Sequence, residues 1–440
     1  IGTLTPNKQF TMGVGIFPAI YNDVEIVTTG DLQDILTSGQ EKEDIGSGIH
    51  HSIDIGYSKN LINYRISLNI NRLFNIHTAV LGNSGSGKSN TIARILQEIY
   101  KKENHSAIGA KTILFDSNGE YPIALTDAGL REKVNTVFYK PIKDTKLYKD
   151  DTGIDYKPFF LPYYLLNLEE WLAFLMASDR AQKPFWDKVL QMTYKFYSIF
   201  NSEQKDDRDS EAKYINYFKW KILGIIDLIL SQIDSDTAKI TAARGIAGRC
   251  LNIINELSKN DELIKFISEI SSRCGLYYGS NDSKLQEYTA KERAKIDEDL
   301  AWQIEESKLN HGDYYDYHFL QTAVEMVLLE EEARGNARIR EFTSTMLTRL
   351  DFFLNNNECR FMRESEHKFD DTQSYLREVF HIGSDERNNQ LITIDSSEVG
   401  TDVLELMTSV VSRMIFDYRK EKIGSDRRQH PVHLFLDEAH

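Results

Sequence analysis

The chain has 440 residues, of which 41% are hydrophobic and 27% charged, and its formal net charge is −15. This composition is typical of a globular protein with two or three domains and disfavours a disordered chain. The negative charge disfavours a surface that coats nucleic acid or anionic membranes nonspecifically, because its field repels phosphate groups. Any contact with DNA must therefore be local.

Cysteine usage and hydropathy indicate the compartment. Cys250, Cys274 and Cys359 are too far apart for a paired metal motif and odd in number, which argues against a secreted disulfide scaffold. No apolar run approaches the roughly 18 residues that span a bilayer. We expect a soluble, cytoplasmic protein with no membrane association. Because the chain begins at Ile1 and stops at His440 directly after a strand-like run, we also expect that part of a longer polypeptide is absent.

The first segment, residues 1–74, has the periodicity of β-strands. In LINYRISLNI, apolar residues alternate with polar ones from Ile62 to Ile70, which predicts a strand with one buried and one solvated face. Turn residues recur at short intervals. The segment therefore predicts a small β-barrel or sandwich.

Residues 75–156 and 386–440 alternate short apolar runs with amphipathic helices, the pattern of a parallel α/β sheet. The expected strands are IHTAVL, TILFD, LITID and HLFLD. Each ends in a loop or an acidic residue at its carboxyl end, where open α/β sheets bind their ligands.

Between residues 157 and 385 the strand patterns disappear and long helical patterns predict an inserted helical bundle. One helix is predicted to begin at Asn167, where Asn-Leu-Glu-Glu supplies an N-cap and an acid three residues later. We interpret the charged stretches EQKDDRDSEAK and KERAKIDEDL as solvated loops or helix faces rather than binding sites.

The run GNSGSGKS matches G-x-x-x-x-G-K-[ST] at every position, between an apolar strand and an amphipathic helix. A flexible turn is the alternative, but the glycines suit a loop whose backbone N–H groups point into one concavity, beside the positive end of the next helix. A triphosphate fits such a loop. The residues predicted to bind ATP are Gly82, Asn83, Ser84, Gly85, Ser86, Gly87, Lys88, Ser89 and Asn90.

The residue types suggest separate roles. Lys88 is expected to reach the β and γ phosphates, and the Ser89 hydroxyl to coordinate Mg²⁺. The run VHLFLDE supplies the acidic partner motif: Asp437 is expected to hold Mg²⁺ and Glu438 to activate the attacking water. The letters DEAH suggest a DEAH-box RNA helicase, but compact helicase cores keep these motifs much closer together than Lys88 and Asp437 are here.

Together with TILFDSNGEYPI and LITIDSSEVG, these motifs resemble the HerA branch of the HerA/FtsK class of DNA-translocating ATPases. GVGIFPAIYNDVEIVTT is similar to that family's N-terminal barrel, and KPFFLPYYLLNLEEWLAFLMASDRAQKPFW to the start of its helical insertion in bacterial members. The resemblance implies an α/β fold: a RecA-like P-loop core (75–156 and 386–440), a helical insertion (157–385) and an N-terminal small β-barrel (1–74).

The resemblance also implies a function. It predicts a homo-oligomeric ring, usually a hexamer, that uses ATP and Mg²⁺ to thread or remodel double-stranded DNA. The implied partner is a nuclease or other effector protein, in DNA end resection or in antiviral defence. Two alternatives stay open: a nucleotide-gated scaffold that organises a partner enzyme with little translocation, and an ATPase that acts on protein substrates.

By the same resemblance, Lys88, Ser89, Asp437 and Glu438 match the family's phosphate, magnesium and catalytic positions. Glu120 matches the acid of a D-x-x-G-E-Y segment near the γ-phosphate, and the alternative is a helix-capping or solvent-facing glutamate. The family's γ-phosphate-sensing glutamine and its neighbour-acting arginine would lie beyond His440. Arg72 is interpreted either as a residue facing a neighbouring subunit's nucleotide or as a plain surface arginine.

A group of arginines is the densest local source of positive charge. These side chains could line a DNA path through contacts with phosphates, or could neutralise nearby acidic helices, which we favour. The residues concerned are Arg244, Arg249, Arg334, Arg338, Arg340 and Arg349.

Overall fold

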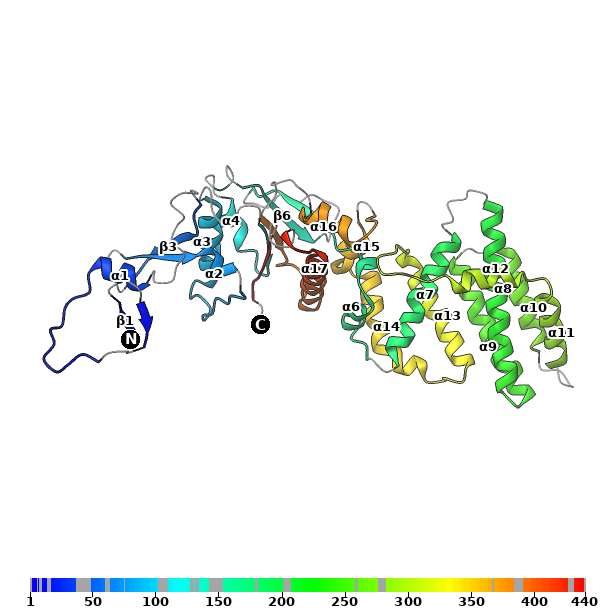
Figure 1. Ribbon diagram of the computed structural model, residues 1–440. Helices are drawn as coiled ribbons and strands as arrows, with labels where there is room; N and C mark the ends of the chain where they lie inside the picture. The colour runs from blue at the N-terminus through cyan, green and yellow to red at the C-terminus, as the bar shows by residue number, and fades with distance from the viewer. Residues whose placement is uncertain are drawn as a thin grey trace.

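The computed structural model describes residues 2–438 except for several short stretches. These exceptions are residues 6, 8–9, 14–16, 37–48, 60–63, 75, 102–109, 127–129, 131–133, 142–152, 179–180, 201–206, 258–259, 276–281, 366–367, 384–390 and 426–430. The molecule is elongated, with the N-terminal strands at one end, an α/β core in the middle and a bundle of helices at the other end (Figure 1).

The α/β core is built on a five-stranded parallel sheet with the strand order β7-β6-β8-β5-β9. The predicted strands TILFD, LITID and HLFLD are all confirmed in this sheet, whereas β6 and β7 were not predicted. The strands are β5 (Lys111–Asp116), β6 (Thr136–Pro141), β7 (Tyr156–Phe159), β8 (Leu391–Asp395) and β9 (Val432–Leu436).

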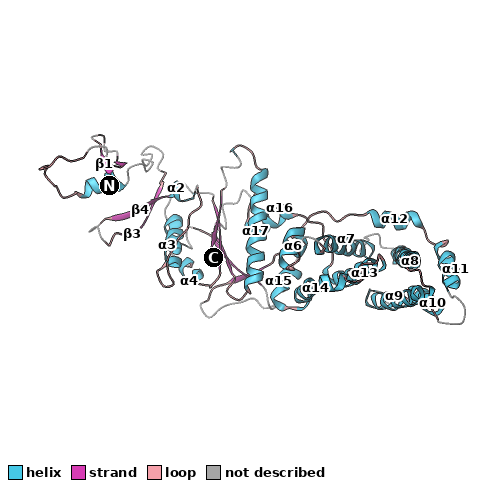
Figure 2. Cartoon of the chain, turned by 90° about the horizontal axis from the view of Figure 1, so that it is seen from below, coloured by secondary structure: helices cyan, strands magenta, loops and turns pink. Residues whose placement is uncertain are grey.

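Helices cover both faces of the sheet, as a run of buried β-branched and aromatic residues requires. In β5, Ile113 and Phe115 face one apolar cluster and Leu114 faces the other. The Leu114 side carries α3 (Lys88–Lys101) and α4 (Tyr121–Leu125), and the opposite side carries α16 (Thr372–Phe380) and α17 (Thr401–Glu421). Figure 2 shows α3 and α17 on opposite sides of the strands.

One predicted strand is wrong. The run IHTAVL (76–81) lies just before the phosphate-binding motif, but the structure gives it no strand pairing. Ile76 is 71% exposed and Leu81 is 89% exposed. Strand β9 is the edge of the sheet in the described part of the chain, and residues 76–81 do not pair with it, so this run lacks the ladder hydrogen bonds that make an apolar segment a strand.

The N-terminal segment forms two antiparallel hairpins, and its described residues do not close into the expected barrel. Strands β1 (Gly2–Leu4) and β2 (Phe10–Met12) pair with each other, as do β3 (Ser52–Tyr57) and β4 (Arg65–Asn69). A barrel needs a continuous ladder, and no described strand joins the two pairs. Two helices belong to this segment, α1 (Thr29–Leu36) and α2 (Ile70–Phe74).

The middle of the chain is mostly helical, although β7 of the sheet extends to Phe159, inside the range 157–385 predicted for the insertion. The predicted start at Asn167 is confirmed: its side chain accepts the Glu170 N–H, and the Glu170 side chain accepts the Asn167 N–H. The elements are η1 (Tyr163–Leu165), α6 (Leu168–Phe174), α7 (Gln182–Phe200), α8 (Asp207–Gln232), α9 (Asp236–Leu257), α10 (Asp261–Arg273), α11 (Asp282–Arg293), α12 (Glu298–Glu306), η2 (Tyr317–Phe319), α13 (Leu320–Ala333), α14 (Ile339–Asn355), η3 (Asn357–Cys359) and α15 (Arg360–Arg363). No described helix is long and apolar enough to cross a bilayer.

Buried aromatic rings and one ion pair join the bundle to the core. The Trp171 ring lies 5.4 Å from that of Trp186 and 5.1 Å from that of Phe353, which connects α6, α7 and α14. Arg413 of α17 donates two hydrogen bonds to the Glu170 carboxylate of α6. The helix that packs on the sheet is thereby tied to the first helix of the bundle.

The aromatic cluster generates a stability prediction. Phe353→Ala removes a fully buried ring that touches three other aromatic rings, so we expect a loss of about 3–5 kcal/mol in the free energy of unfolding. Phe342→Ala in the same helix is the matched control, because Phe342 is 53% exposed, and it should cost less than about 1 kcal/mol. Urea unfolding of both variants measures this, and equal costs would contradict the packing described.

His433 of β9 generates a pH prediction. Burial lowers the pKa of His433 from 6.5 to about 4, and its ring stacks on Phe74 at 4.5 Å. Because the folded state disfavours the charged form, stability should fall as the pH drops from 6.5 to 4, by at most about 1.4 kcal/mol per pH unit from this group. His433→Phe keeps the stacking and should remove this component. The measurement is urea unfolding of both proteins across this range, and identical pH slopes would contradict the assignment.

Candidate nucleotide-binding site

The predicted phosphate-binding loop leads directly into α3, which begins at Lys88. Two of its glycines have positive φ angles, +76° at Gly85 and +90° at Gly87, which residues with a side chain rarely adopt. A side chain at Gly82 would place its Cβ 2.3 Å from Ser86 Oγ, so another residue there would force the Ser86 side chain to move. The sequence therefore uses glycine here for curvature and close approach.

Polar contacts hold the loop in its curled form. Lys88 Nζ donates to the Gly82 carbonyl at 3.1 Å, and the Thr91 N–H and hydroxyl both donate to the Gly87 carbonyl at 2.9 Å. Residues 82–86 are exposed to solvent. The first N–H groups of α3 have no acceptor within the helix, so they can serve an anion at its positive end.

The acidic motif follows β9, the strand beside β5. The Asp437 N–H donates to the Phe115 carbonyl at 3.2 Å, and Ser117 Oγ donates to the Asp437 carbonyl at 3.0 Å. The backbone of Asp437 is thus fixed to the end of β5. Glu438, the next residue, is exposed and has a φ of +52°, a strained conformation that native proteins keep mostly at functional sites.

Tyr121 joins the phosphate-binding loop to the acidic motif. Tyr121 is hydrogen-bonded to the Ser89 side chain, and the Tyr121 hydroxyl donates a long hydrogen bond of 3.4 Å to Asp437 Oδ1. Ser89 and Asp437, the two predicted magnesium ligands, are therefore neighbours across one phenol group, although most of the chain separates them in sequence.

Three carboxylates gather at this point. Burial and the nearby charges of Glu438 and Glu120 raise the pKa of Asp437, while the hydrogen bond from Tyr121 lowers it. Glu120 is exposed and directly precedes α4, but its side chain makes no capping hydrogen bond to that helix. The structure therefore excludes the interpretation of Glu120 as a side-chain helix cap. Its charge acts on Asp437, which places it at the candidate site.

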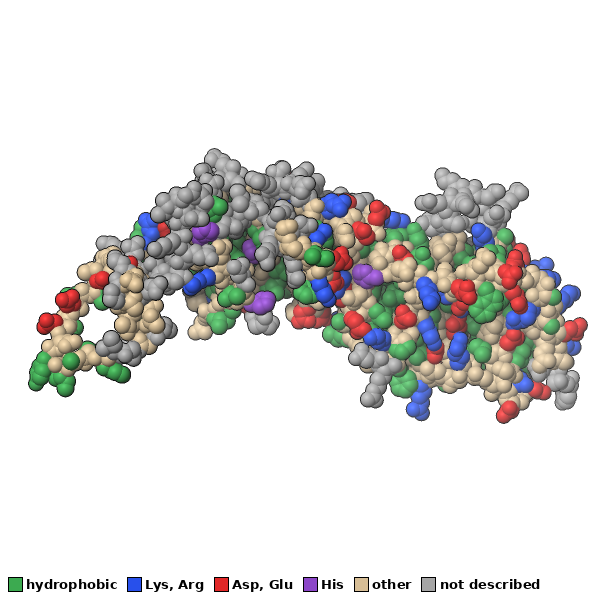
Figure 3. Space-filling model, viewed as in Figure 1, with side chains coloured by type: hydrophobic (Ala, Val, Ile, Leu, Met, Phe, Trp, Pro, Cys, Tyr) green, Lys and Arg blue, Asp and Glu red, His purple; other side chains and the backbone are tan. Residues whose placement is uncertain are grey.

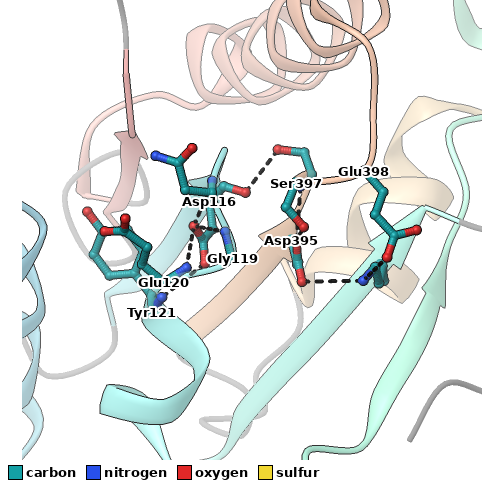
Figure 4. A network of polar contacts seen from close by, with 10 residues as sticks. Asp116, Gly119, Glu120, Tyr121, Asp395, Ser397 and Glu398 are labelled. Atoms are coloured by element: carbon teal, nitrogen blue, oxygen red, sulfur yellow. Dashed lines mark hydrogen bonds and ion pairs between the residues drawn. The ribbon is translucent and has the colours of Figure 1, made fainter. Parts of the chain in front are cut away.

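The loop that carries Glu120 and Tyr121 is organised by Asp116, at the end of β5. The Asp116 carboxylate is fully buried and accepts the N–H groups of residues 118, 119, 120 and 121 at 2.7–3.3 Å. Figure 4 shows this carboxylate surrounded by the loop. Burial raises the pKa of Asp116 and these hydrogen bonds oppose that effect. Backbone donors of this kind give a buried carboxylate the partners that it needs.

A second set of polar side chains lies beside Asp116 at the end of β8. Asp395 accepts the N–H and the hydroxyl of Ser397 at 3.0 and 2.6 Å, and Lys140 Nζ lies 2.6 Å from Glu398 and 3.8 Å from Asp395 (Figure 4). The Ser396 N–H and hydroxyl donate to the Asp116 carbonyl at 2.9 and 3.0 Å. These contacts lock the loops after β5 and β8 together.

The residues present fit ATP with Mg²⁺. Asp437 Oδ2 is buried and has no hydrogen-bond partner among the residues that the structure describes, which leaves it available to the ligand shell of a cation. Within the same described residues no group of three His, Cys, Asp or Glu side chains forms a metal cage. That is the expected arrangement for Mg²⁺, which binds through one or two protein ligands together with water and phosphate oxygens.

Half of the predicted basic group is neutralised within the chain. Arg340 contacts Glu325 and Glu332 at 2.8 and 2.7 Å, Arg349 contacts Asp402 at 2.7 Å, and Arg249 contacts Glu332. Figure 3 shows Lys and Arg interspersed with Asp and Glu over the helical bundle on the face in view. For these three arginines the structure favours neutralisation of acidic helices over a basic path.

Sequence reasoning identified Lys88, Ser89, Asp437, Glu438 and Glu120, and the structure brings Ser89, Asp437, Glu438 and Glu120 to one place. Sequence reasoning did not assign roles to Asp116 or Tyr121, although both lie in the D-x-x-G-E-Y segment. The signal was present: an acid at a strand end, followed by a glycine of φ +71°, is typical of a loop wrapped around a carboxylate.

Comparisons with known proteins show the family of the chain. The model of the family described as "Helicase HerA, central domain" matches residues 53–415, a range that includes the phosphate-binding loop and Asp116 and ends before Asp437. A probable helicase of Methanocaldococcus jannaschii is 30% identical over 118 residues, which is 27% of this chain and 22% of that protein. The match therefore spans about a fifth of the length of this relative.

Asp116 generates a prediction about local order. Asp116→Ala leaves four buried or partly buried N–H groups without their acceptor, so amide exchange at residues 118–121 should accelerate and stability should fall by about 1–3 kcal/mol. Asp371→Ala is the control, because Asp371 caps α16 through the Ser374 N–H at a distance from this loop. It should cost about 1 kcal/mol and leave exchange at 118–121 unchanged. Unaltered protection in Asp116→Ala would contradict the organising role.

Proposed function

The chain belongs to the family of the HerA helicase central domain, and from this premise we propose that it is the ATP-hydrolysing subunit of a ring that threads or remodels double-stranded DNA. The observation that carries the ATPase part is the contact of Ser89 and Asp437 through Tyr121. This contact supports the proposal because it brings a phosphate-binding loop beside an acidic strand end, the two parts between which P-loop enzymes hold a magnesium-bound nucleotide.

Each residue has a role in this proposal. Lys88 and the curled loop bind the phosphates, and Ser89 and Asp437 hold the ion. When bound, Mg²⁺ neutralises charge on the phosphate oxygens. Glu438, exposed beside Asp437, orients the attacking water and takes its proton, a role that contributes about a hundred- to ten-thousandfold in rate. By its match to the family motif, Glu120 would face the γ-phosphate.

The proposal about DNA rests on family membership. This part of the proposal includes a hexameric ring, an N-terminal barrel and a nuclease or other effector partner. It also includes a role in end resection or antiviral defence. The alternative is a nucleotide-gated scaffold that organises a partner enzyme with little translocation. Two observations favour that alternative: the net charge of −15 and the internal pairing of Arg249, Arg340 and Arg349.

Glu438→Gln tests the hydrolytic role. Because the amide accepts no proton from water, we expect ATP turnover to fall by about a hundred- to ten-thousandfold while ATP affinity stays within a few-fold of the wild-type value. Glu405→Gln, on the exposed surface of α17, is the control and should keep the wild-type rate. Phosphate release and equilibrium nucleotide binding give the two readouts. A Glu438→Gln protein that hydrolyses ATP at the wild-type rate would show that another group activates the water.

Duplex DNA distinguishes the motor from the scaffold. We expect double-stranded DNA to raise the ATP turnover of the wild-type protein, with a stimulation that declines as salt increases, because phosphate contacts release counterions. The same titration with Glu438→Gln should give no stimulated turnover and so exclude a contaminating ATPase. A turnover rate that is independent of duplex DNA of any length would favour the scaffold.

A further inference from the structure

Tyr121 contacts both predicted magnesium ligands, Ser89 and Asp437. It is 1% exposed and begins α4, with Pro122 as the next residue. Its ring belongs to the apolar cluster beneath α3, together with Leu96 and Leu114. Only its hydroxyl reaches the site, so the phenol is a polar tip on a side chain anchored in the core.

The two hydrogen bonds of this hydroxyl join the two predicted magnesium ligands. Tyr121 is hydrogen-bonded to the Ser89 side chain and donates to Asp437 Oδ1. Oδ1 of Asp437 is thereby engaged, while Oδ2 is buried and has no hydrogen-bond partner among the described residues. The phenol therefore fixes one carboxylate oxygen and leaves the other for Mg²⁺ or its water ligands.

The phenol is itself held in place. Asp116 Oδ2 accepts the Tyr121 N–H at 3.1 Å, so the backbone that carries the ring is part of the wrapped loop. The Tyr121 side chain is packed into the apolar cluster beneath α3, so the ring is fixed at both ends.

We infer that Tyr121 is a positioning residue for Mg²⁺: its hydroxyl orients the Ser89 oxygen and the Asp437 carboxylate so that both face the ion. This inference rests on the proposed ATP binding and adds a determinant of metal affinity that is separate from the phosphate-binding loop. Outer-shell partners of this kind contribute about ten- to a hundredfold to metal affinity, because an unoriented ligand must be ordered when the ion binds.

Tyr121→Phe tests the inference through nucleotide binding rather than turnover. The probe is a fluorescent ATP analogue, titrated into the purified protein at a series of free Mg²⁺ concentrations and also in excess EDTA. We expect the Mg²⁺ concentration for half-maximal tight binding to rise about ten- to a hundredfold, because the hydroxyl no longer orients the ligands. The affinity in EDTA should stay within about twofold of the wild-type value, since the loop is unchanged.

Tyr100→Phe is the matched control. Tyr100 belongs to the same apolar cluster, is 5% exposed, and its hydroxyl bonds to Thr112 Oγ1 at 2.7 Å rather than to the site. It should keep the wild-type magnesium dependence. Thermal unfolding of both variants shows whether either loses its fold.

The outcomes separate the two proposals. If Tyr121→Phe keeps the wild-type magnesium dependence, or loses affinity equally with Mg²⁺ and in EDTA, the positioning role is wrong while ATP binding stands. If the wild-type protein binds the analogue neither with Mg²⁺ nor in EDTA, the proposed function fails and the inference falls with it.

Discussion

Parallel pairing of β5 with β8 on one side and with β9 on the other is the constraint on which the site depends. Strands that run in the same direction end at the same edge of a sheet, so Asp116, Asp395 and Asp437 come together although they are far apart in sequence. The backbone bonds from Ser396 and Asp437 to the end of β5 then fix the neighbouring loops. The chemistry of the site is thus a consequence of strand register.

The phosphate-binding loop could be predicted from sequence because its physics is local. Positive φ angles at Gly85 and Gly87, and the close approach at Gly82, leave few alternatives to glycine. The helix start at Asn167 was equally predictable, since a capping box acts within four residues. Strands β5, β8 and β9 were recognisable as short apolar runs that end in acids.

Other features depend on tertiary partners that no local pattern contains. Residues 76–81 have the composition of a strand, but composition does not decide pairing, and the described sheet ends at β9 without them. Strands β6 and β7 carry Lys140, Pro141 and Pro158, polar or ring-constrained residues that obscure the apolar pattern. The role of Tyr121 depends on contacts with Ser89 and Asp437, one on each side of it in the chain. Likewise, the pairing of Arg340 with Glu325 and Glu332 became visible only when the helices were placed.

The position of the helical bundle within the sequence has a consequence for how the chain folds. The interior strand β5 is synthesised early, and all six of its residues are buried in the finished sheet. Both of its neighbours lie beyond the bundle, so the ribosome releases an apolar strand long before its hydrogen-bonding partners exist. Contacts between residues so far apart in sequence give the sheet a high contact order, which slows folding. They also prolong the exposure of unpaired, aggregation-prone strand edges. The bundle, whose contacts are mostly between nearby helices, can mature first and bring the two halves of the sheet within reach of each other.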